Sequence, residues 1–313
     1  MHAAVLHELG APSFGEFEEP VAGEGQAVVE VAVAGLNPID ARKASGTFYT
    51  GPPPLPSVVG SEAVGRVAGD GRRVYVERSV APFGTMAERV LVDTEALIDL
   101  PDAIEDDVAV ALGIAGLAAW LPLSWRAQLQ PGETVLVLGA TGAVGQLAVQ
   151  VAKLLGAGRV VAAGRDKELL RRTAELGADA TVELTGTPEQ LAAAFREAAG
   201  GAVDVVHDPL WGAPASAALE ALAPGGRLIQ LGQSAGADAT FSSASIRGRG
   251  LDIRGYTNFN VPDDVRHAAY AALVEHAAAG RIAVDVERVP LRDVADAWAR
   301  LQAGARRKLL LVP

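Results

Sequence analysis

The sequence predicts an α/β protein with a doubly wound parallel sheet, an all-β region before it and a short mixed segment after it. Two observations carry this prediction. After Pro131, six candidate strands alternate with helical stretches, as in a right-handed parallel sheet. Before about Leu100, short strands are separated by turns rich in glycine and proline. Because 313 residues exceed the usual size of one domain, we expect two domains.

The first hundred residues form the all-β region. The run at residues 51–56 is rich in proline, which lacks an N–H donor and restricts the residue before it, so we expect a surface loop there. A polar turn at residues 35–40 leads into a short helical segment at residues 41–44. The candidate strands are residues 3–6, 27–34, 63–67, 73–76 and 87–92.

The rest of the chain alternates between strands and helices. The final elements, a helix at 262–280, a strand at 284–289, a helix at 291–303 and a strand at 308–312, are expected to return to the first domain. The candidate strands of the parallel sheet are residues 135–138, 159–163, 180–184, 203–207, 227–232 and 251–255, and the helices between them are residues 142–155, 167–176, 188–198, 214–222 and 242–247.

Residues 134–145 read as a buried strand, a glycine turn and the start of a helix. Glycines spaced GxxGxxG let the chain turn tightly, bring backbone N–H groups against a phosphate and pack the helix close to the sheet. The helix N-terminus then favours the anion. We therefore predict a dinucleotide pyrophosphate site, the alternative being a tight turn that binds nothing. The expected contacts are Gly139, Thr141, Gly142, Ala143, Val144 and Gly145.

The residues after the second strand of the sheet indicate which nicotinamide cofactor binds. An NAD enzyme normally places a carboxylate here for the ribose hydroxyls, but the first polar residue is Arg165. A guanidinium suits a 2′-phosphate, and Gly164 leaves room for it. We therefore predict NADPH. Asp166 is the alternative ribose ligand, although the cap of the helix starting at Lys167 is the favoured interpretation.

Composition excludes several classes of function. With 27 basic and 38 acidic residues the net charge is -11, which argues against binding to nucleic acid or to an anionic membrane. The absence of cysteine excludes disulfides, cysteine nucleophiles and thiolate zinc sites. The N-terminus lacks the pattern of a secretion signal, so we expect a cytoplasmic protein. The apolar stretch 108–121 is too short to span a bilayer and precedes Pro122, which favours a buried helix beside the cofactor.

Several motifs together resemble the medium-chain dehydrogenases and reductases, in particular their zinc-free quinone oxidoreductase (zeta-crystallin-like) branch. The resemblance covers essentially the whole chain. It implies a GroES-like β-barrel at 1–113, a Rossmann dinucleotide-binding domain at 114–260 and a segment at 261–313 that completes the barrel, with the active site between the domains. The motifs are GLNPID at 35–40, GSEAVG at 60–65, GLAAW at 116–120, LQPGE at 129–133, the turn at 139–145, LGAD at 176–179 and KLLLVP at 308–313.

The zinc branch of this family can be tested on the residues. Its zinc sites need cysteine, histidine or acidic ligands, but this chain has Gly60, Ser61 and Glu62 where the zinc enzymes have Gly-His-Glu, and its five histidines lack ligand spacing. We predict no metal. Without a Lewis acid, reduction of a quinone or an activated alkene is the better chemical fit.

The resemblance also implies site residues. Asn37 matches an asparagine near the nicotinamide. Relatives commonly carry a tyrosine eleven residues later that helps deliver a proton; here Phe48 stands there and Tyr49 follows, so the proton comes from Tyr49 or from solvent. His207 is interpreted as a buried histidine. Further cofactor contacts, mostly at strand carboxyl ends, are expected from Asp208, Pro209, Leu231, Gly232, Gln233, Tyr256, Asn258 and Lys308.

These observations predict a zinc-independent, NADPH-dependent reductase of a small-molecule electrophile, either a quinone or an α,β-unsaturated carbonyl compound. Two alternatives stay open: a nucleotide-binding protein without turnover, and a zinc-free NADP-dependent alcohol dehydrogenase. The strand at 251–255 is expected at the edge of the sheet, where pairing with a second copy would give a homodimer.

Overall fold

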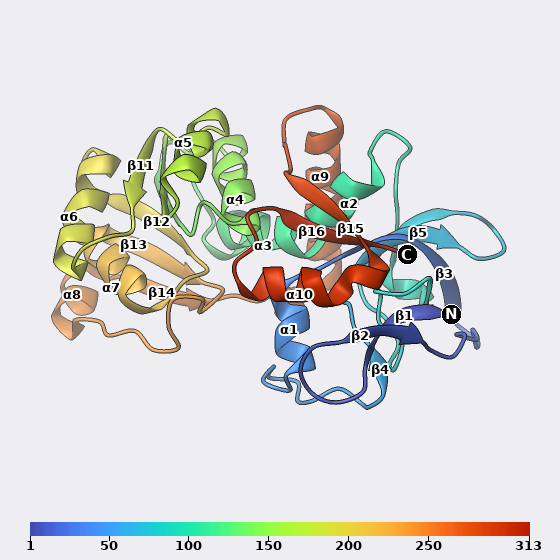
Figure 1. Ribbon diagram of the computed structural model, residues 1–313. Coiled ribbons are helices and arrows are strands. Elements are labelled where there is room, and N and C mark those ends of the chain that lie inside the picture. Colours follow the sequence, from blue (N-terminus) through green and yellow to red (C-terminus); the bar gives the residue numbers. More distant parts are fainter. The chain divides into compact units, whose positions relative to one another are not determined.

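The computed structural model describes residues 1–313 and divides into two compact units (Figure 1). One unit consists of Met1–Ile114 and Val274–Pro313, and the other of Ala115–Leu273. The expected boundary after residue 260 lies earlier than the observed one, because helix α9 (Asp263–Ala278) continues from the second unit into the first.

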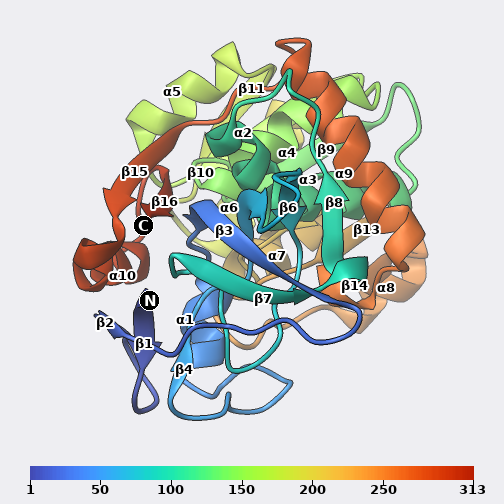
Figure 2. The ribbon, with the colours of Figure 1, turned by 90° about the vertical axis from the view of Figure 1, so that its right-hand side faces the viewer.

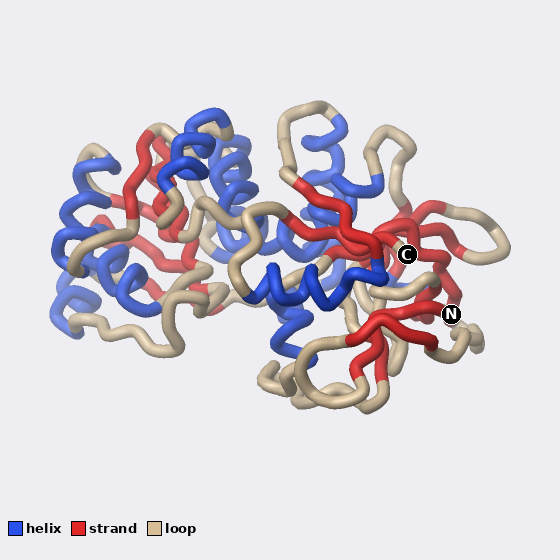
Figure 3. The backbone as a smooth tube through the Cα atoms, in the orientation of Figure 1, coloured by secondary structure: helices blue, strands red, loops and turns tan.

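The second unit is built on a six-stranded parallel sheet with the order β11-β10-β9-β12-β13-β14. Figure 3 shows these strands with helices along them. The doubly wound parallel sheet predicted from the sequence is therefore confirmed, and β14 is an edge strand as expected. The strands are β9 (Thr134–Leu138), β10 (Arg159–Gly164), β11 (Ala180–Glu183), β12 (Val203–Asp208), β13 (Leu222–Gln230) and β14 (Asp252–Gly255).

Helices connect consecutive strands of this sheet. The central strand β9 is buried at Val135, Leu136, Val137 and Leu138, as its continuous apolar run predicts for a strand covered on both faces. On one face, Phe195 of α6 shares a core with the sheet and with α7 and α8. The helices are α4 (Ala143–Leu154), α5 (Lys167–Glu175), α6 (Pro188–Ala199), α7 (Gly212–Ala221) and α8 (Ser243–Arg249), followed by the short turn η4 (Asn258–Asn260).

The first unit contains two sheets (Figure 2). In the larger sheet the C-terminal strand pairs antiparallel with β3, with Leu310 opposite Gly35. Its order is β15 (Val286–Pro290), β16 (Lys308–Val312), β3 (Gln26–Gly35), β5 (Ala63–Val67), β6 (Arg73–Val76) and β8 (Leu97–Asp99), with β7 (Arg89–Asp93) also paired to β3. The smaller sheet has the order β2 (Ser13–Glu16), β1 (His2–Leu6) and β4 (Ser57–Val58).

Helices α1 (Pro38–Ala44) and α10 (Val294–Gln302) lie beside the strands of this unit, which also includes α2 (Asp106–Ala111) and the end of α9. Helix α1 follows β3, and α10 places Trp298 in the core with Leu36 and Leu309. The turns η1 (Thr94–Ala96) and η5 (Leu291–Asp293) complete the unit. The sequence missed β2, β4 and β8, because they have only two to four residues and little hydrophobic alternation.

The apolar stretch near the middle of the chain is helical over a longer range than predicted, with a kink at Gly113, where ψ is -106°. It comprises α2 (Asp106–Ala111), η2 (Leu112–Gly116), α3 (Leu117–Leu121) and η3 (Pro122–Arg126). Pro122 does not end it, because this proline stands in the first turn of η3, where its missing N–H is tolerated, and the Ala127 N–H donates to its carbonyl. By length and composition the helix could cross a membrane, but 67% of its most apolar window is buried inside the structure, as for a core helix.

Candidate functional site

The turn between β9 and α4 depends on glycine. Gly139 has a φ of +64°, which residues with a side chain rarely adopt. A Cβ on Gly145 would collide with the Gly139 carbonyl oxygen, and a Cβ on Gly164 would lie 2.7 Å from the Thr141 side chain. The end of β10 and the start of α4 therefore approach the turn as closely as the sequence predicted.

The N-terminus of α4 lacks a side-chain cap. Its first-turn N–H groups have no partner within the helix, and Gly142 at the cap position offers no side chain. The helices α5, α6 and α8 differ, because Asp166, Thr187 and Ser242 accept hydrogen bonds from their first turns. An uncapped N-terminus of a twelve-residue helix, reached through a bare turn, is suited to a phosphate group.

The end of β10 separates the two candidate ribose ligands. The Asp166 carboxylate accepts hydrogen bonds from the N–H groups of Glu168 (3.0 Å) and Leu169 (3.1 Å), so Asp166 caps α5, as the sequence favoured. Arg165 is exposed and makes no hydrogen bond or ion pair. Its guanidinium is therefore available for an anionic group.

Strand β12 ends in two buried titratable residues. His207 Nε2 lies 2.9 Å from the carbonyl oxygen of Ala118, and burial lowers the His207 pKa to about 4. His207 is therefore a neutral core histidine, as expected. Asp208 accepts hydrogen bonds from the N–H groups of Leu210 and Trp211 with one oxygen, whereas the other oxygen is sealed without a partner. Burial raises the Asp208 pKa to about 6.

The other predicted strand-end residues lie at the same edge of the parallel sheet, where the carboxyl ends of its strands meet. The Leu231 N–H donates to the Asp208 carbonyl, and a Cβ on Gly232 would lie 2.5 Å from the Pro209 carbonyl oxygen. The next residue, Gln233, is exposed. Beyond β14, the buried Tyr256 hydroxyl donates to Asn258 Oδ1 at 2.8 Å.

In the first unit, a buried carboxylate organises a polar cluster. Glu62 follows the loop before β5 and is fully buried. Four donors reach its two oxygens: Asn37 Nδ2 at 2.7 Å, Lys308 Nζ at 2.8 Å, the Tyr75 hydroxyl at 3.1 Å and the Ile114 N–H at 2.6 Å. All four donors are therefore satisfied by one carboxylate, which holds these four segments of the chain together.

The cluster joins two residues that the sequence suggested separately. Asn37 uses both amide hydrogens, on Glu62 Oε1 and on the Gly35 carbonyl, and its oxygen accepts from Lys308 Nζ. The predicted catalytic asparagine and the predicted cofactor-binding lysine thus share the Glu62 carboxylate. The sequence placed Glu62 in a motif but gave it no role, because its partners Asn37 and Lys308 lie 25 and 246 positions away in the chain.

The donor groups of this cluster can be compared with the ligands of the zinc site that part of this fold family carries. Ser61 and Asn37 offer a hydroxyl and an amide, both already hydrogen-bonded to neighbouring side chains, and the Lys308 ammonium pairs with Glu62. Zinc prefers thiolate, imidazole and carboxylate ligands, and a lysine ammonium would repel it. These donors do not fit a zinc ion.

Tyr49 lies in the loop after α1. It is 67% exposed, and its ring centroid is 3.9 Å from that of Phe48, which is buried. Phe48, which stands where relatives carry the tyrosine, is thus the buried member of the pair, and Tyr49 is at the surface of this unit.

Two family models match the chain. Residues 143–275 match a model described as zinc-binding dehydrogenase, and residues 23–102 match one described as alcohol dehydrogenase GroES-like domain. The matched segments contain the glycine-turn helix and most of the strands of the first unit. The fold and the turn thus define the class of dehydrogenases with a GroES-like domain and a dinucleotide-binding domain.

Individual relatives narrow this class. The chain is 31% identical over 249 residues to mouse (Mus musculus) quinone oxidoreductase-like protein 2, covering 77% of this chain and 70% of that protein. Its fold matches Escherichia coli quinone oxidoreductase, solved in complex with NADPH, with a TM-score of 0.88, 25% identity and full coverage of both chains. The chain therefore belongs to the medium-chain dehydrogenase/reductase family of oxidoreductases, as the motifs predicted.

Much longer proteins contain a related segment. The chain is 34% identical over 297 residues to one component of the phenolphthiocerol/phthiocerol polyketide synthase of Mycobacterium tuberculosis. The match covers 89% of this chain but 13% of that protein. The chain thus corresponds to one part of the longer enzyme.

Proposed function

We propose that this protein is an NADPH-dependent reductase that works without zinc and transfers a hydride to a quinone or to the β-carbon of an α,β-unsaturated carbonyl compound. The main supporting observation is the bare glycine turn at the uncapped N-terminus of α4, with the unpaired Arg165 at the end of the neighbouring strand. The NADPH found in the E. coli quinone oxidoreductase supports the same choice of cofactor.

In this proposal the second unit binds the cofactor. The N–H groups at Ala143, Val144 and Gly145 hold the pyrophosphate, and the Arg165 guanidinium pairs with the 2′-phosphate. The nicotinamide, when bound, would supply a hydride to the acceptor. Further contacts come from the strand-end residues Asp208, Pro209, Leu231, Gly232, Gln233, Tyr256 and Asn258.

The first unit supplies positioning and the proton. Because Asn37 and Lys308 already satisfy each other and Glu62, we infer that they fix the geometry of the segment around Asn37. Tyr49, or a water molecule, donates the proton that completes reduction of the acceptor, since an enolate or hydroquinone oxygen needs no strong acid.

An acceptor screen tests the proposal. Purified protein is mixed with NADPH and a panel of quinones, enones and simple aldehydes, and oxidation is followed at the nicotinamide absorbance. We expect oxidation that depends on a quinone or an enone and is insensitive to chelators. Tight NADPH binding with no oxidation by any acceptor would instead support a nucleotide-binding protein without turnover, which the surface position of Tyr49 favours.

The edge strand β14 supports a homodimer. β14 pairs only with β13, so its other side is open to a second copy of the chain. We expect a dimer by sedimentation at micromolar concentration, and a monomer under those conditions would contradict it.

A further inference from the structure

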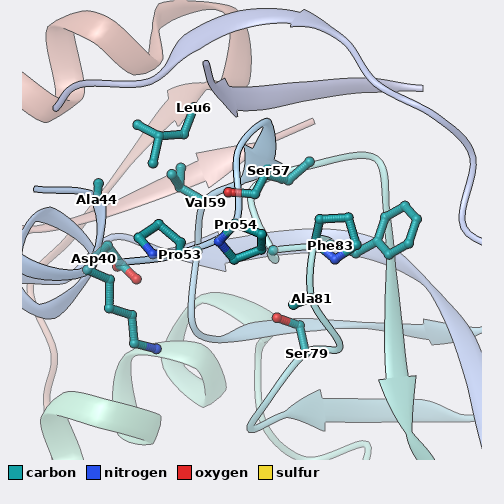
Figure 4. Close-up of a pocket in the computed structure, with 15 residues that line it drawn as sticks. Leu6, Asp40, Ala44, Pro53, Pro54, Ser57, Val59, Ser79, Ala81 and Phe83 are labelled. Carbon is teal, nitrogen blue, oxygen red and sulfur yellow. The ribbon is translucent and has the colours of Figure 1, made fainter. Parts of the chain in front are cut away.

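A cavity of about 170 Å³ lies in the first unit, and none of the residues proposed to hold NADPH lines it. It is bounded by α1, by the loop at residues 53–60 and by the loop at residues 79–84 (Figure 4). A cavity of roughly 150 Å³ holds one benzene molecule. The space therefore fits a compound with a single six-membered ring.

Most of the wall is apolar. Figure 4 shows Leu6, Val59, Pro53, Pro54 and Phe83 around the space. Apolar walls with a few polar groups are typical of sites for small organic ligands. The wall thus favours a largely apolar ligand.

Two serine hydroxyls supply the uncharged polar side-chain groups of the wall. Ser57 is only 4% exposed, and its hydroxyl has no hydrogen-bond partner in the protein. The Ser57 hydroxyl oxygen is not sealed from solvent, so it is accessible within the small exposed part of this residue. Ser79 lines the cavity as well, and its hydroxyl also has no partner. Both hydroxyls are thus free to exchange a hydrogen bond with a ligand or with water in the cavity.

The charged groups of the wall balance one another. Lys43 Nζ donates to the Ser61 hydroxyl at 3.0 Å, and this hydroxyl donates to Asp40 Oδ1 at 2.6 Å. The other Asp40 oxygen accepts the Asn37 N–H at 2.8 Å. With one acid and one base linked in this way, the wall favours neither an anion nor a cation. The same chain of hydrogen bonds joins the cavity to Asn37, the residue predicted to lie near the nicotinamide.

We propose that this cavity binds a neutral carbonyl compound with one ring, whose ring packs against the apolar wall and whose oxygen accepts a hydrogen bond from Ser57. If the proposed reductase function holds, this ligand is the hydride acceptor. The acceptors are then quinones and enones with a single ring.

Binding is tested with cyclohexanone, which has the ring and the carbonyl but no activated alkene. Its affinity for the full chain is measured by ligand-observed NMR without NADPH. Ser57→Ala removes the hydroxyl and is expected to weaken binding about fivefold. Ser57→Val also fills part of the space and is expected to weaken it more than about tenfold. Ser13→Ala, which changes an exposed serine in the same sheet, is the matched control and leaves the affinity unchanged.

Turnover is measured separately with cyclohex-2-enone and NADPH. We expect Ser57→Ala to raise the KM for the enone by a similar factor while the KM for NADPH stays constant. Equal cyclohexanone affinity in the wild type and Ser57→Val, or no binding to the wild type, would overturn the cavity assignment. An enone KM unchanged in Ser57→Ala would overturn the identification with the acceptor. If cyclohexanone binding depends on Ser57 but no acceptor is reduced, the cavity assignment holds and the proposed reductase function fails.

Discussion

The two units handle their polar groups in opposite ways. In the first unit, Glu62, Asn37 and Lys308 lie buried and satisfy one another. In the second unit, the turn before α4 presents backbone N–H groups without a cap, beside the unpaired Arg165. A network closed on itself stabilises and positions, whereas an open set of donors is ready for a ligand. Buried polar groups are therefore not equal evidence for a binding site.

The closed network is expected to give the largest effect on stability. Lys308→Met leaves the Glu62 carboxylate buried without its ammonium partner, which should lower the free energy of unfolding by about 3–5 kcal/mol. Lys153→Met is the matched control, because the Lys153–Asp179 pair is partly exposed and should contribute less than about 1 kcal/mol. Urea denaturation measures both. Similar losses in the two variants would show that the buried cluster is not special.

A substitution in the open turn, Gly142→Ala, is expected to lower NADPH affinity without lowering the free energy of unfolding. A Cβ on Gly142 meets only the Gly139 carbonyl oxygen, at an ordinary 3.5 Å, so Gly142→Ala should change the free energy of unfolding by less than about 0.5 kcal/mol. In the proposed cofactor site the added methyl would occupy the place where the phosphate approaches, so we expect NADPH affinity to fall at least about 100-fold, or about 2.8 kcal/mol. Nicotinamide fluorescence measures the affinity.

Gly145→Ala provides the contrast within the same turn. Its Cβ would collide with the Gly139 carbonyl, so this variant should lose stability as well as affinity. If Gly142→Ala binds NADPH as tightly as the wild type, the turn serves packing alone and the proposed cofactor site is wrong.

The end of β12 has a third kind of polar group, which is sealed and only partly satisfied. Burial raises the Asp208 pKa from 3.8 to about 6, so between these pH values the folded state holds a proton that the unfolded chain has released. The contribution to the free energy of unfolding is therefore complete below pH 3.8 and is lost as pH rises through 6. His207, whose pKa falls to about 4, acts in the opposite direction: its contribution is present above pH 6.5 and is lost as pH falls towards 4. Between pH 4 and 6 the two contributions oppose each other.

Asp208→Asn separates these contributions. The asparagine keeps the oxygen that accepts from the Leu210 and Trp211 N–H groups but does not titrate. From pH 4.5 to pH 7, the free energy of unfolding of the wild type should therefore fall by about 2 kcal/mol relative to the variant. Urea denaturation at both pH values gives the difference, and a constant difference would show that Asp208 is ionised throughout.

Much of the fold could be predicted from the sequence, because its signals are local. The continuous apolar run of β9, the glycine spacing and the alternation after Pro131 fix the parallel sheet. The short strands β2, β4 and β8 could not be predicted, because their pairing partners and not their own residues determine them.

The candidate site divides in the same way. The glycine turn and the Asp166 cap were predictable, since the residues involved are neighbours in the chain. The Glu62–Lys308 pair joins residues 246 positions apart, and the cavity beside Ser57 is formed by segments from four parts of the first unit. Such features depend on the tertiary fold, and no spacing in the sequence indicates them.

The smallest expected effect concerns the choice of nucleotide. Arg165→Ala removes one charge-assisted contact to a 2′-phosphate, so NADPH affinity should fall about 10–100-fold, or about 1.4–2.8 kcal/mol, while NADH affinity stays the same. Asp166→Ala is the control: it removes the cap of α5 and should lower stability by about 1 kcal/mol without changing the preference for NADPH. Titration of both nucleotides by nicotinamide fluorescence gives the result. If the wild type instead prefers NADH and Asp166→Ala removes that preference, the cap carboxylate also binds the ribose and the NADPH assignment is wrong.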